Sequence, residues 1–486
     1  MRADALKARL GERGLLAAWP DRFPEGLTGV ATDSRIVAPG SLFVAYKGAA
    51  LDGHAYLAAA QAKGASAALV EREVPEVALP QARVTNGRLA AAAAAALAYG
   101  DPAGRLLLLA VTGTNGKTTT AHLLRHLFGD TAPAGSLGTL GAVDGTGRVL
   151  PGTGNLTTPG PVELQATLAA LVALGVRTVA MEASSHSLDQ DRVAGLGFAA
   201  AVYTNFTRDH LDYHADEEAY LAAKLRLSSY LVADGWEIVN AAEAAWQRLA
   251  PRERRLSFGL DVPADVRASA VQGAPLGSRF NLTARGATMA AALPLLGRFN
   301  VENALGAAAT ALALGRDLEA VVARLADAPQ VPGRMERIAE SPCVVLRDYA
   351  HTPDALERAI AAVRPLTAGR LLLVFGCGGD RDRGKRPVMG EIAAKGASIA
   401  IVTSDNPRTE NPERIIDDIE EGMAGTPHLR IADRRQAIAR AVAMARPDDT
   451  ILLAGKGHET YQIVGRDKLP FDEAEVVHAA VEALKP

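Results

Sequence analysis

Short apolar runs alternate along most of the chain with segments whose apolar residues recur at helical spacing. Continuous apolar runs of this length are typical of strands buried on both faces of a parallel sheet, and helices cover those faces. The alternation therefore predicts an α/β fold. The predicted buried strands are 105–111, 177–181, 199–203, 343–347, 370–375, 398–402 and 450–454.

Helical spacing appears between these runs and after them. The first such segment is almost entirely alanine, the residue with the highest helix propensity. The predicted helices are 89–97, 118–128, 217–231, 301–314, 353–363, 386–395, 434–445 and 473–483.

Two punctuated segments divide the chain. Residues 100–104 contain two glycines, and residues 327–333 contain Pro329 and Pro332, which are breaker signals. A length of 486 residues favours about three domains. We therefore predict domains over 1–100, 101–330 and 331–486, the last a second doubly wound unit.

Composition excludes several classes of protein. Hydrophobic residues make up 48% of the chain, and 52 basic against 55 acidic side chains give a net charge of −3, which argues against a general nucleic-acid binder. The two cysteines cannot form a disulfide framework. No apolar run is long enough to span a membrane, and residues 1–10 lack a signal-peptide core. We expect a soluble cytoplasmic protein.

A glycine-containing turn between a predicted strand and a predicted helix carries the clearest chemical signal. Gly113 and Gly116 would let backbone N–H groups and a helix N-terminus cradle a polyphosphate. Lys117 would reach the terminal phosphates, and the Thr118 hydroxyl would ligate Mg²⁺. Val111 stands where the general phosphate loop has its first glycine, so this turn is a variant of that loop.

Two further polar segments follow predicted strands, at the edge where open α/β sheets bind ligands. Glu182 offers an oxygen ligand that suits Mg²⁺. His210 would be an unusual ligand for this metal, but Asp209 and Asp212 beside it favour a functional role over that of a core histidine. Lys224 has, by spacing alone, no feature that distinguishes it from a surface lysine.

Polar loops follow three predicted C-terminal strands, at 376–386, 404–408 and 455–459. Strands of one parallel sheet bring such loops to the same edge, which predicts one composite site. Guanidinium groups bind carboxylates and phosphates in bidentate fashion, so the first loop suits an anionic ligand. Its basic residues are Arg381, Arg383, Lys385 and Arg386.

Together these motifs resemble the Mur ligase family over essentially the whole chain. The resemblance rests on the loop 113–119, Glu182, the segment 205–210 and the Asp-Tyr-Ala-His segment 348–351. The segment 33–35 and the loop 405–408 narrow it to members that add meso-diaminopimelate to UDP-N-acetylmuramoyl-L-alanyl-D-glutamate.

The resemblance implies a UDP-sugar-binding domain, a central ATP-binding domain with a parallel sheet of the phosphate-loop ATPase type, and a C-terminal Rossmann-like domain that binds the amino acid. It also implies ATP and Mg²⁺ as cofactors, and a role in peptidoglycan precursor synthesis. The glutamate γ-carboxylate would attack the ATP γ-phosphate, and the incoming amine would attack the resulting acyl phosphate. We expect a monomer with no nucleic-acid partner and no membrane insertion.

Functional residues carry over from the family by position. ATP contacts are implied at Gly113, Thr114, Asn115, Gly116, Lys117, Thr118, Thr119, Asn303, Arg334, Asp348 and His351. UDP-sugar-peptide contacts are implied at Thr32, Ser34, Thr157, Thr158, Ser184, Gln190 and Arg192. Diaminopimelate contacts are implied at Arg381, Asp405, Asn406, Pro407, Arg408, Gly455 and Glu459. Metal ligands are implied at Thr118, Glu182, His210 and Lys224 as a carbamate (N6-carboxylysine), with catalytic roles for Lys117, His210 and Lys224.

Three alternatives stay open at this point: a lysine-adding Mur ligase, a folylpolyglutamate synthase, and a nucleotide-dependent switch. Arg408 argues against the first, because L-lysine lacks the distal carboxylate that a guanidinium would pair with. The segment 33–35 and the loop 405–408 disfavour the second. Residues 49–51 offer no polar side chain to a uracil, so we expect backbone contacts there.

Overall fold

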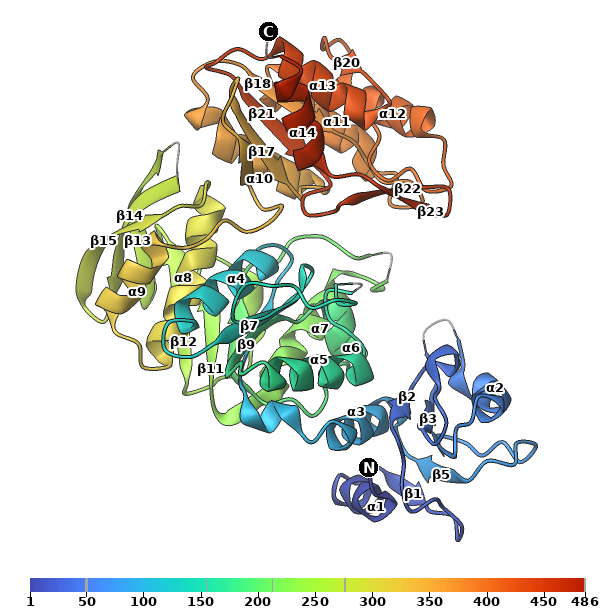
Figure 1. Cartoon of the computed structure of the whole chain (residues 1–486). Coiled ribbons are helices and arrows are strands. Elements are labelled where there is room, and N and C mark those ends of the chain that lie inside the picture. The colour runs from blue at the N-terminus through green and yellow to red at the C-terminus, as the bar shows by residue number, and fades with distance from the viewer. Residues whose placement is uncertain (49–50, 155, 212, 275–276, 485–486) are drawn as a thin grey trace.

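The structure is a computed structural model that describes residues 1–48, 51–154, 156–211, 213–274 and 277–484. The expectations for Asp212 and for residues 49–50 fall outside this part of the chain. The chain folds into three α/β units, each built around its own sheet, coloured blue, cyan to yellow, and orange to red in Figure 1.

The N-terminal unit has a sheet of order β1-β5-β4-β3-β2, which is parallel except for β1 at its edge. Its strands are β1 (Leu16–Ala18), β2 (Val30–Ala31), β3 (Leu42–Ala45), β4 (Ala67–Val70) and β5 (Gln81–Val84). Its helices are α1 (Ala3–Glu12), α2 (Leu57–Ala62) and α3 (Gly87–Ala98). The alanines of α3 are buried against this sheet, which explains why such small side chains recur there.

The central unit has a long sheet of order β15-β14-β13-β12-β11-β10-β6-β9-β7-β8. Its strands are β6 (Leu107–Thr112), β7 (Ala134–Gly138), β8 (Gly141–Val143), β9 (Thr178–Glu182), β10 (Phe198–Tyr203), β11 (Leu231–Asn240), β12 (Arg255–Leu260), β13 (Val266–Ala274), β14 (Gly277–Ala284) and β15 (Ala287–Leu293). Its helices are α4 (Lys117–Phe128), α5 (Pro161–Ala173), α6 (Ser185–Asp189), α7 (Glu217–Leu225), α8 (Arg298–Ala313) and α9 (Leu318–Ala326).

This central sheet is parallel from β7 through β13 and antiparallel at both ends. The hairpins β13–β14–β15 therefore extend the expected parallel sheet. Strand β6 shows why the middle is so apolar: Leu109 and Val111 pack in the cluster with α4 and α8, whereas Leu108 and Ala110 pack on the opposite face with α5.

The C-terminal unit has a sheet of order β16-β17-β21-β18-β19-β20, parallel except for β16, and a separate hairpin β22–β23. Its strands are β16 (Glu336–Ala339), β17 (Val344–Asp348), β18 (Leu371–Phe375), β19 (Ile399–Val402), β20 (Leu429–Arg430), β21 (Thr450–Ala454), β22 (Tyr461–Val464) and β23 (Asp467–Pro470). Its helices are α10 (Pro353–Val363), α11 (Lys385–Gly396), α12 (Pro412–Glu420), α13 (Arg434–Met444) and α14 (Glu473–Glu482).

The predicted strands and helices are present with shifts of at most three residues at their ends, apart from one helix that is too long in the prediction. The predicted helix 217–231 ends at Leu225, continues as a 3₁₀ turn over Arg226–Tyr230, and then enters β11. The predicted domain limits near 100 and 330 fall between α3 and β6 and between α9 and β16. Among the described helices, none is long and apolar enough to cross a membrane.

Candidate functional site

At two positions, the turn between β6 and α4 approaches its neighbours so closely that only glycine fits. Gly113 has a φ of 146°, and a Cβ built there would lie 1.9 Å from Oγ1 of Thr204. Gly116 has a φ of 83°, and its Cβ would lie 2.2 Å from Oδ1 of Asn303 on α8. The predicted phosphate loop is thus pressed against β10 and α8, with α4 starting directly after it.

Two lysines converge on the carbonyl oxygen of Gly113. Nζ of Lys117 donates to it at 3.0 Å, and Nζ of Lys224 donates to it at 2.7 Å. Burial lowers the pKa of Lys117, and burial together with the charge of Lys117 lowers the pKa of Lys224 well below its ordinary value. This environment favours the uncharged amine of Lys224, which is buried and not a surface lysine.

Thr118 and Glu182 form the oxygen-rich side of this loop. The Thr118 hydroxyl donates to Glu182 Oε1 at 2.9 Å, and the backbone N–H and hydroxyl of Thr139 donate to the same carboxylate at 2.8 and 3.1 Å. Among the described residues, no group of three His, Cys, Asp or Glu side chains could hold a metal by itself. One hydroxyl and one carboxylate nevertheless fit Mg²⁺, which binds through few protein ligands and takes others from water and phosphate.

His210 lies at the same end of the sheet with a left-handed backbone, at a φ of 55°. Its ring is 5.9 Å from the ring of Tyr220, whose face lies 4.3 Å from Nζ of Lys224. Although burial opposes ionisation, His210 and His351 hold the pKa of Asp209 below its ordinary value. Two residues with predicted metal and catalytic roles therefore flank one aromatic ring.

The C-terminal unit contacts this site through the segment before β16 and the segment after β17. Arg334 Nη2 donates to the Thr118 hydroxyl at 3.1 Å, and its guanidinium lies 4.6 Å from the centre of the Tyr349 ring. Asn115 Nδ2 donates to Asp354, in the first turn of α10, at 3.1 Å. These bonds join the phosphate loop to the third sheet.

Asp348 and His351 are half-buried beside the contact between the central and C-terminal units. Asp348 accepts the backbone N–H groups of Met335 and Ala350 at 2.7 and 2.8 Å, and burial raises the pKa of its carboxyl. Burial lowers the pKa of His351, whose Nδ1 lies 2.8 Å from the carbonyl oxygen of Tyr349. These bonds lie within the C-terminal unit and hold the backbone next to Arg334 and at Tyr349.

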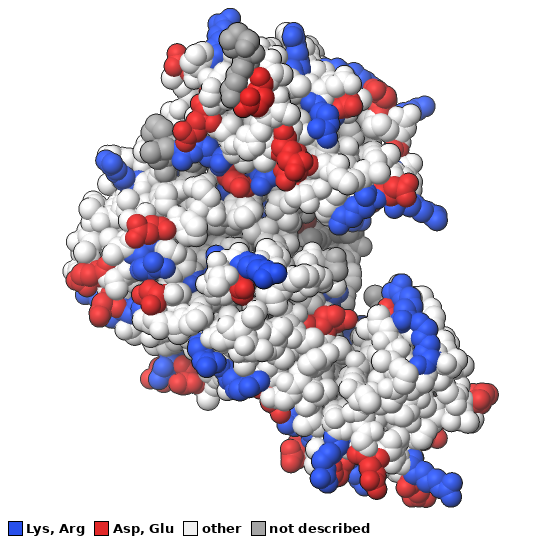
Figure 2. Space-filling model, in the orientation of Figure 1, with Lys and Arg blue, Asp and Glu red and all other residues white. Residues whose placement is uncertain are grey.

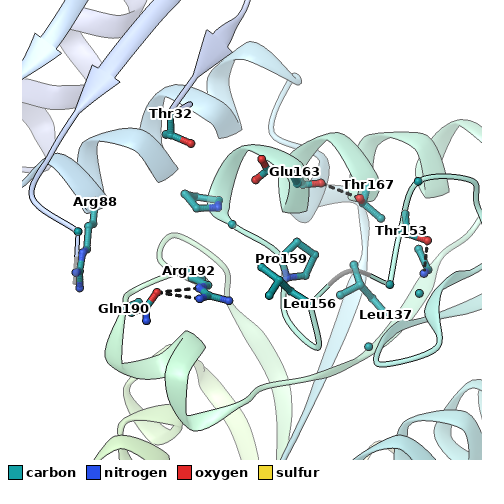
Figure 3. Close-up of a pocket in the computed structure, with 18 of the residues that line it drawn as sticks. Thr32, Arg88, Leu137, Thr153, Leu156, Pro159, Glu163, Thr167, Gln190 and Arg192 are labelled. Carbon is teal, nitrogen blue, oxygen red and sulfur yellow. Dashed lines mark hydrogen bonds between the residues drawn. The ribbon is translucent and has the colours of Figure 1, made fainter. Parts of the chain in front are cut away.

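A cavity of about 440 Å³ lies where the N-terminal and central units meet (Figure 3). Thr32 and Arg88 line it from the N-terminal unit, and Gln190 and Arg192 line it from the central unit. Arg192 donates to Gln190 Oε1 at 2.9 Å and to the carbonyl oxygen of Thr158 at the same distance, and burial lowers its pKa. The volume is that of a small-molecule site.

Other residues predicted for this pocket lie behind its wall or at its edge. The Thr158 hydroxyl is buried and donates to the carbonyl oxygen of Glu182 at 2.8 Å, and Ser184 caps α6. Thr157 lies 3.4 Å from the Thr139 hydroxyl. Ser34 is absent from the lining described for the cavity. The prediction missed Tyr46, Arg88 and Glu163, because no local motif marks them.

The three predicted polar loops of the C-terminal unit do meet at one edge, since β21, β18 and β19 are neighbours in the sheet. Arg408 has a φ of 52°, and its Nη1 donates to the carbonyl oxygen of Gly379 at 2.8 Å. Arg381 belongs to the same glycine-containing loop, with its Cγ 3.8 Å from a Cβ built at Gly378, and its side chain is exposed. Asp405, Asn406 and Pro407 are buried.

Two of the basic residues in the loop 376–386 make structural contacts, whereas the sequence indicated that they bind an anionic ligand. Arg386 is fully buried and pairs with Glu410 and Asp418, at 2.9 and 2.7 Å, so its charge stabilises the fold and is not free to bind an anion. Lys385 Nζ donates to the carbonyl oxygen of His351 at 2.8 Å. The sequence also gave no reason to single out Lys456, which is fully buried among the predicted amino-acid contacts.

Family models match all three units. The Mur ligase family, catalytic domain, matches residues 26–110, the Mur ligase middle domain matches 111–311, and the Mur ligase, glutamate ligase domain, matches 333–457.

Curated relatives are similar over nearly the whole chain. The UDP-N-acetylmuramoyl-L-alanyl-D-glutamate–2,6-diaminopimelate ligase of Synechococcus elongatus is 44% identical, covering 96% of this chain and 98% of its own. The ligase of the same name from Thermosynechococcus vestitus is 46% identical, covering 91% of each chain.

Solved structures of other proteins share the fold of this chain. A ligase of that name superposes with a TM-score of 0.69 at 34% identity, covering 96% of this chain and 99% of its own. A Mycobacterium tuberculosis folylpolyglutamate synthase shares the fold at 20% identity and a TM-score of 0.64, but covers only 76% of this chain and 92% of its own. The identity and coverage of the curated relatives show that the chain belongs to the Mur ligase family.

Proposed function

We propose that this chain is an ATP-dependent, ADP-forming amide ligase. It adds meso-diaminopimelate to the D-glutamate of UDP-N-acetylmuramoyl-L-alanyl-D-glutamate, through an acyl phosphate, in cytoplasmic peptidoglycan precursor synthesis. The observation that carries the proposal is the joint between the phosphate loop and the third sheet, made by Arg334 with Thr118 and by Asn115 with Asp354. This joint connects a nucleoside-triphosphate site to loops suited to an amino acid.

The phosphate loop supports the first chemical step. Phosphoryl transfer depends on positioning and charge neutralisation more than on a protein nucleophile. Lys117 and Arg334 supply positive charge beside the loop, and Gly113 and Gly116 let its backbone approach a phosphate. Mg²⁺, held by Thr118 and Glu182, would add charge neutralisation on the phosphates.

The environment of Lys224 supports its modification to a carbamate. Only the uncharged form of an amine reacts with carbon dioxide, and the surroundings of Lys224 favour that form. The reaction would also place an anion beside Lys117, which adds an attraction between the two side chains that the uncharged amine cannot provide.

The cavity between the N-terminal and central units supports the binding of a UDP-linked substrate. Arg192 and Arg88 bring two guanidinium groups to one cavity, and guanidinium groups bind diphosphates well (Figure 3). The cavity is formed partly by the N-terminal unit, through Thr32 and Arg88.

The test is phosphate release by the purified protein with ATP, Mg²⁺ and the UDP-linked dipeptide, with a panel of meso-diaminopimelate, L-lysine and L-glutamate and the product mass checked. Turnover only with meso-diaminopimelate is expected. Turnover with L-lysine would keep the ligase activity and overturn the specificity. Phosphate release that needs no amino acid would instead support a nucleotide-dependent switch.

Arg408 carries the specificity in this proposal. Its guanidinium would pair with the distal carboxylate of diaminopimelate, while Gly379 holds it in place. Arg408→Ala should lower kcat/KM for meso-diaminopimelate at least about a hundredfold, because loss of a desolvated charge pair is costly. Arg414→Ala, which alters an exposed arginine on α12 of the same unit, is the control. An unchanged kcat/KM in the Arg408 variant would overturn this role.

A further inference from the structure

A buried lysine lies at the centre of the three polar loops, and no step of the proposed reaction uses it. Lys456, in the loop after β21, has a fully buried side chain. Its Nζ donates to Asn406 Oδ1 and to Glu459 Oε2, each at 3.1 Å, and lies 3.5 Å from Asp405 Oδ1. One ammonium group therefore contacts three side chains of the amino-acid loops.

The same contacts fix the orientation of the Asn406 amide. Its Oδ1 accepts from Lys456 and also from the backbone N–H of Ile463 in β22, at 2.9 Å. Its Nδ2 donates to Glu459 Oε2 at 2.8 Å. The loop after β19, the loop after β21 and the hairpin β22–β23 are thus joined around Lys456.

The charges in this cluster are not balanced. Asp405 and Glu459 bring two carboxylates, and among the ion pairs of the described residues Lys456 is the cation that pairs with both. Oδ1 of Asp405 is buried and makes no hydrogen bond within the described part of the chain. Lys456 lies 3.5 Å from this oxygen as an ion pair, so the oxygen still lacks a hydrogen-bond donor, which a ligand with an ammonium group would supply.

We propose that Lys456 is a positioning residue that holds Asp405, Asn406 and Glu459 in the arrangement that receives an ammonium group of the incoming amino acid. It keeps the two carboxylates close together despite their mutual repulsion. Its own side chain is fully buried and has no contact with solvent. The inference rests on the proposed function and adds a residue to its amino-acid site.

The test compares Lys456→Met with the wild-type enzyme by steady-state kinetics. The KM for meso-diaminopimelate should rise at least about tenfold, because hydrogen bonds to charged groups each contribute enough to change affinity about that much. The KM values for ATP and for the UDP-linked dipeptide should stay within about twofold, since their predicted contacts lie elsewhere.

Arg370→Met is the matched control. Arg370 pairs with the buried carboxylate of Asp449 at 2.6 Å, at the opposite end of β21. This substitution removes the cation that pairs with a buried carboxylate of the same sheet, and it leaves the three polar loops unchanged. Its thermal stability should fall while its KM for meso-diaminopimelate stays the same. A similar rise of this KM in both variants would mean that Lys456 acts only through stability, and would overturn the inference.

A double-mutant cycle with Glu459→Gln tests the mechanism and guards against misfolding. The double variant removes one cation and one anion together, so the cluster keeps its wild-type net charge, whereas Lys456→Met alone makes it one unit more negative. If Lys456 acts by holding Glu459, adding Lys456→Met to Glu459→Gln should raise the KM less than about threefold further. Multiplicative effects of the two changes would contradict the inference. Absence of wild-type turnover with every amino acid would instead contradict the proposed function.

Discussion

At the scale of single residues, the site is defined by groups that a general stability argument would not choose. Gly116 is needed because Asn303 occupies the space of its Cβ, and Lys224 is a buried amine beside a second lysine. Both features cost stability in isolation. Both lie at the turn after β6, where we propose that phosphates bind.

The cost of a side chain at Gly116 can be separated from the cost of its backbone conformation. Gly116→Ala should reduce ATP-dependent turnover at least about a hundredfold, because the new Cβ collides with Asn303. Gly175→Ala is the control, since Gly175 has nearly the same φ, 84° against 83°, and no heavy atom within 4 Å of its Cβ. Turnover and thermal unfolding are measured for both. Equal losses would mean that backbone strain alone is responsible.

Lys224→Met should separate activity from stability. Turnover should fall by orders of magnitude, whereas the melting temperature in bicarbonate-free buffer at pH 7 should not fall, because an apolar side chain of similar length suits this buried position better. The carbonyl oxygen of Gly113 keeps its bond from Lys117. A clear loss of stability would show that the unmodified lysine is a structural residue.

The pH dependence gives a second readout for the same variant. Because the pKa of Lys224 is lowered in the folded state, the unfolded state binds more protons, and wild-type stability should rise with pH up to the ordinary lysine value of 10.5. The Met variant lacks this contribution. The melting temperature of the wild type should therefore rise relative to that of the Met variant as the pH rises. A constant difference between the two melting temperatures would argue against a lowered pKa of Lys224.

At the scale of elements, helix α7 brings Lys224 to the phosphate loop. Its first turn is capped by Asp216, whose carboxylate accepts the backbone N–H of Ala219 at 2.7 Å, and its last turn carries Lys224. The helix has only nine residues, so tertiary packing and the cap must stabilise it together.

Asp216→Ala should lower the melting temperature by roughly 2–4 °C, since loss of an N-cap costs about 1 kcal/mol. Asp216→Asn should behave like the wild type, because asparagine caps helices as well as aspartate does. Differential scanning calorimetry of the two variants measures the difference. Equal melting temperatures in both would show that the cap does not stabilise α7.

At the scale of the whole molecule, three units surround the site, and the space-filling view shows a hollow between the central and C-terminal units (Figure 2). The phosphate loop belongs to the central unit, and the loops around Lys456 belong to the C-terminal unit. The amine of one substrate must reach the activated carboxyl group of the other, so we expect the units to close on their ligands.

Closure should be visible by small-angle X-ray scattering. The radius of gyration should decrease when a non-hydrolysable ATP analogue, the UDP-linked dipeptide and meso-diaminopimelate are all present. Asn115→Ala, which removes the hydrogen bond to Asp354, should weaken this response without changing the N-terminal pocket. An unchanged radius in the wild type would mean that the chain already has its reactive arrangement.

What the sequence determined by itself follows from local rules. The apolar runs of β6, β18 and β21 predicted buried strands, because a strand covered on both faces needs no polar side. The turn with Gly113 and Gly116 predicted a phosphate loop, and the loops after the C-terminal strands predicted a shared edge, because parallel strands align their carboxyl ends. Strand β2, with two residues, and the edge hairpins β13–β15 were missed, since short or alternating strands give a weak periodic signal.

Tertiary structure alone decided the roles of charged side chains. Spacing could not distinguish Lys224 and Lys456 from surface lysines. It also could not show that Arg386, unlike the other arginines of its loop, is buried in ion pairs and does not bind a ligand. Their burial and partners depend on residues far away in the chain: Gly113 for Lys224, Asn406 for Lys456, and Glu410 with Asp418 for Arg386. The physical reason is that desolvation and charge pairing are set by three-dimensional neighbours, whereas strands and turns are set mainly by neighbours in sequence.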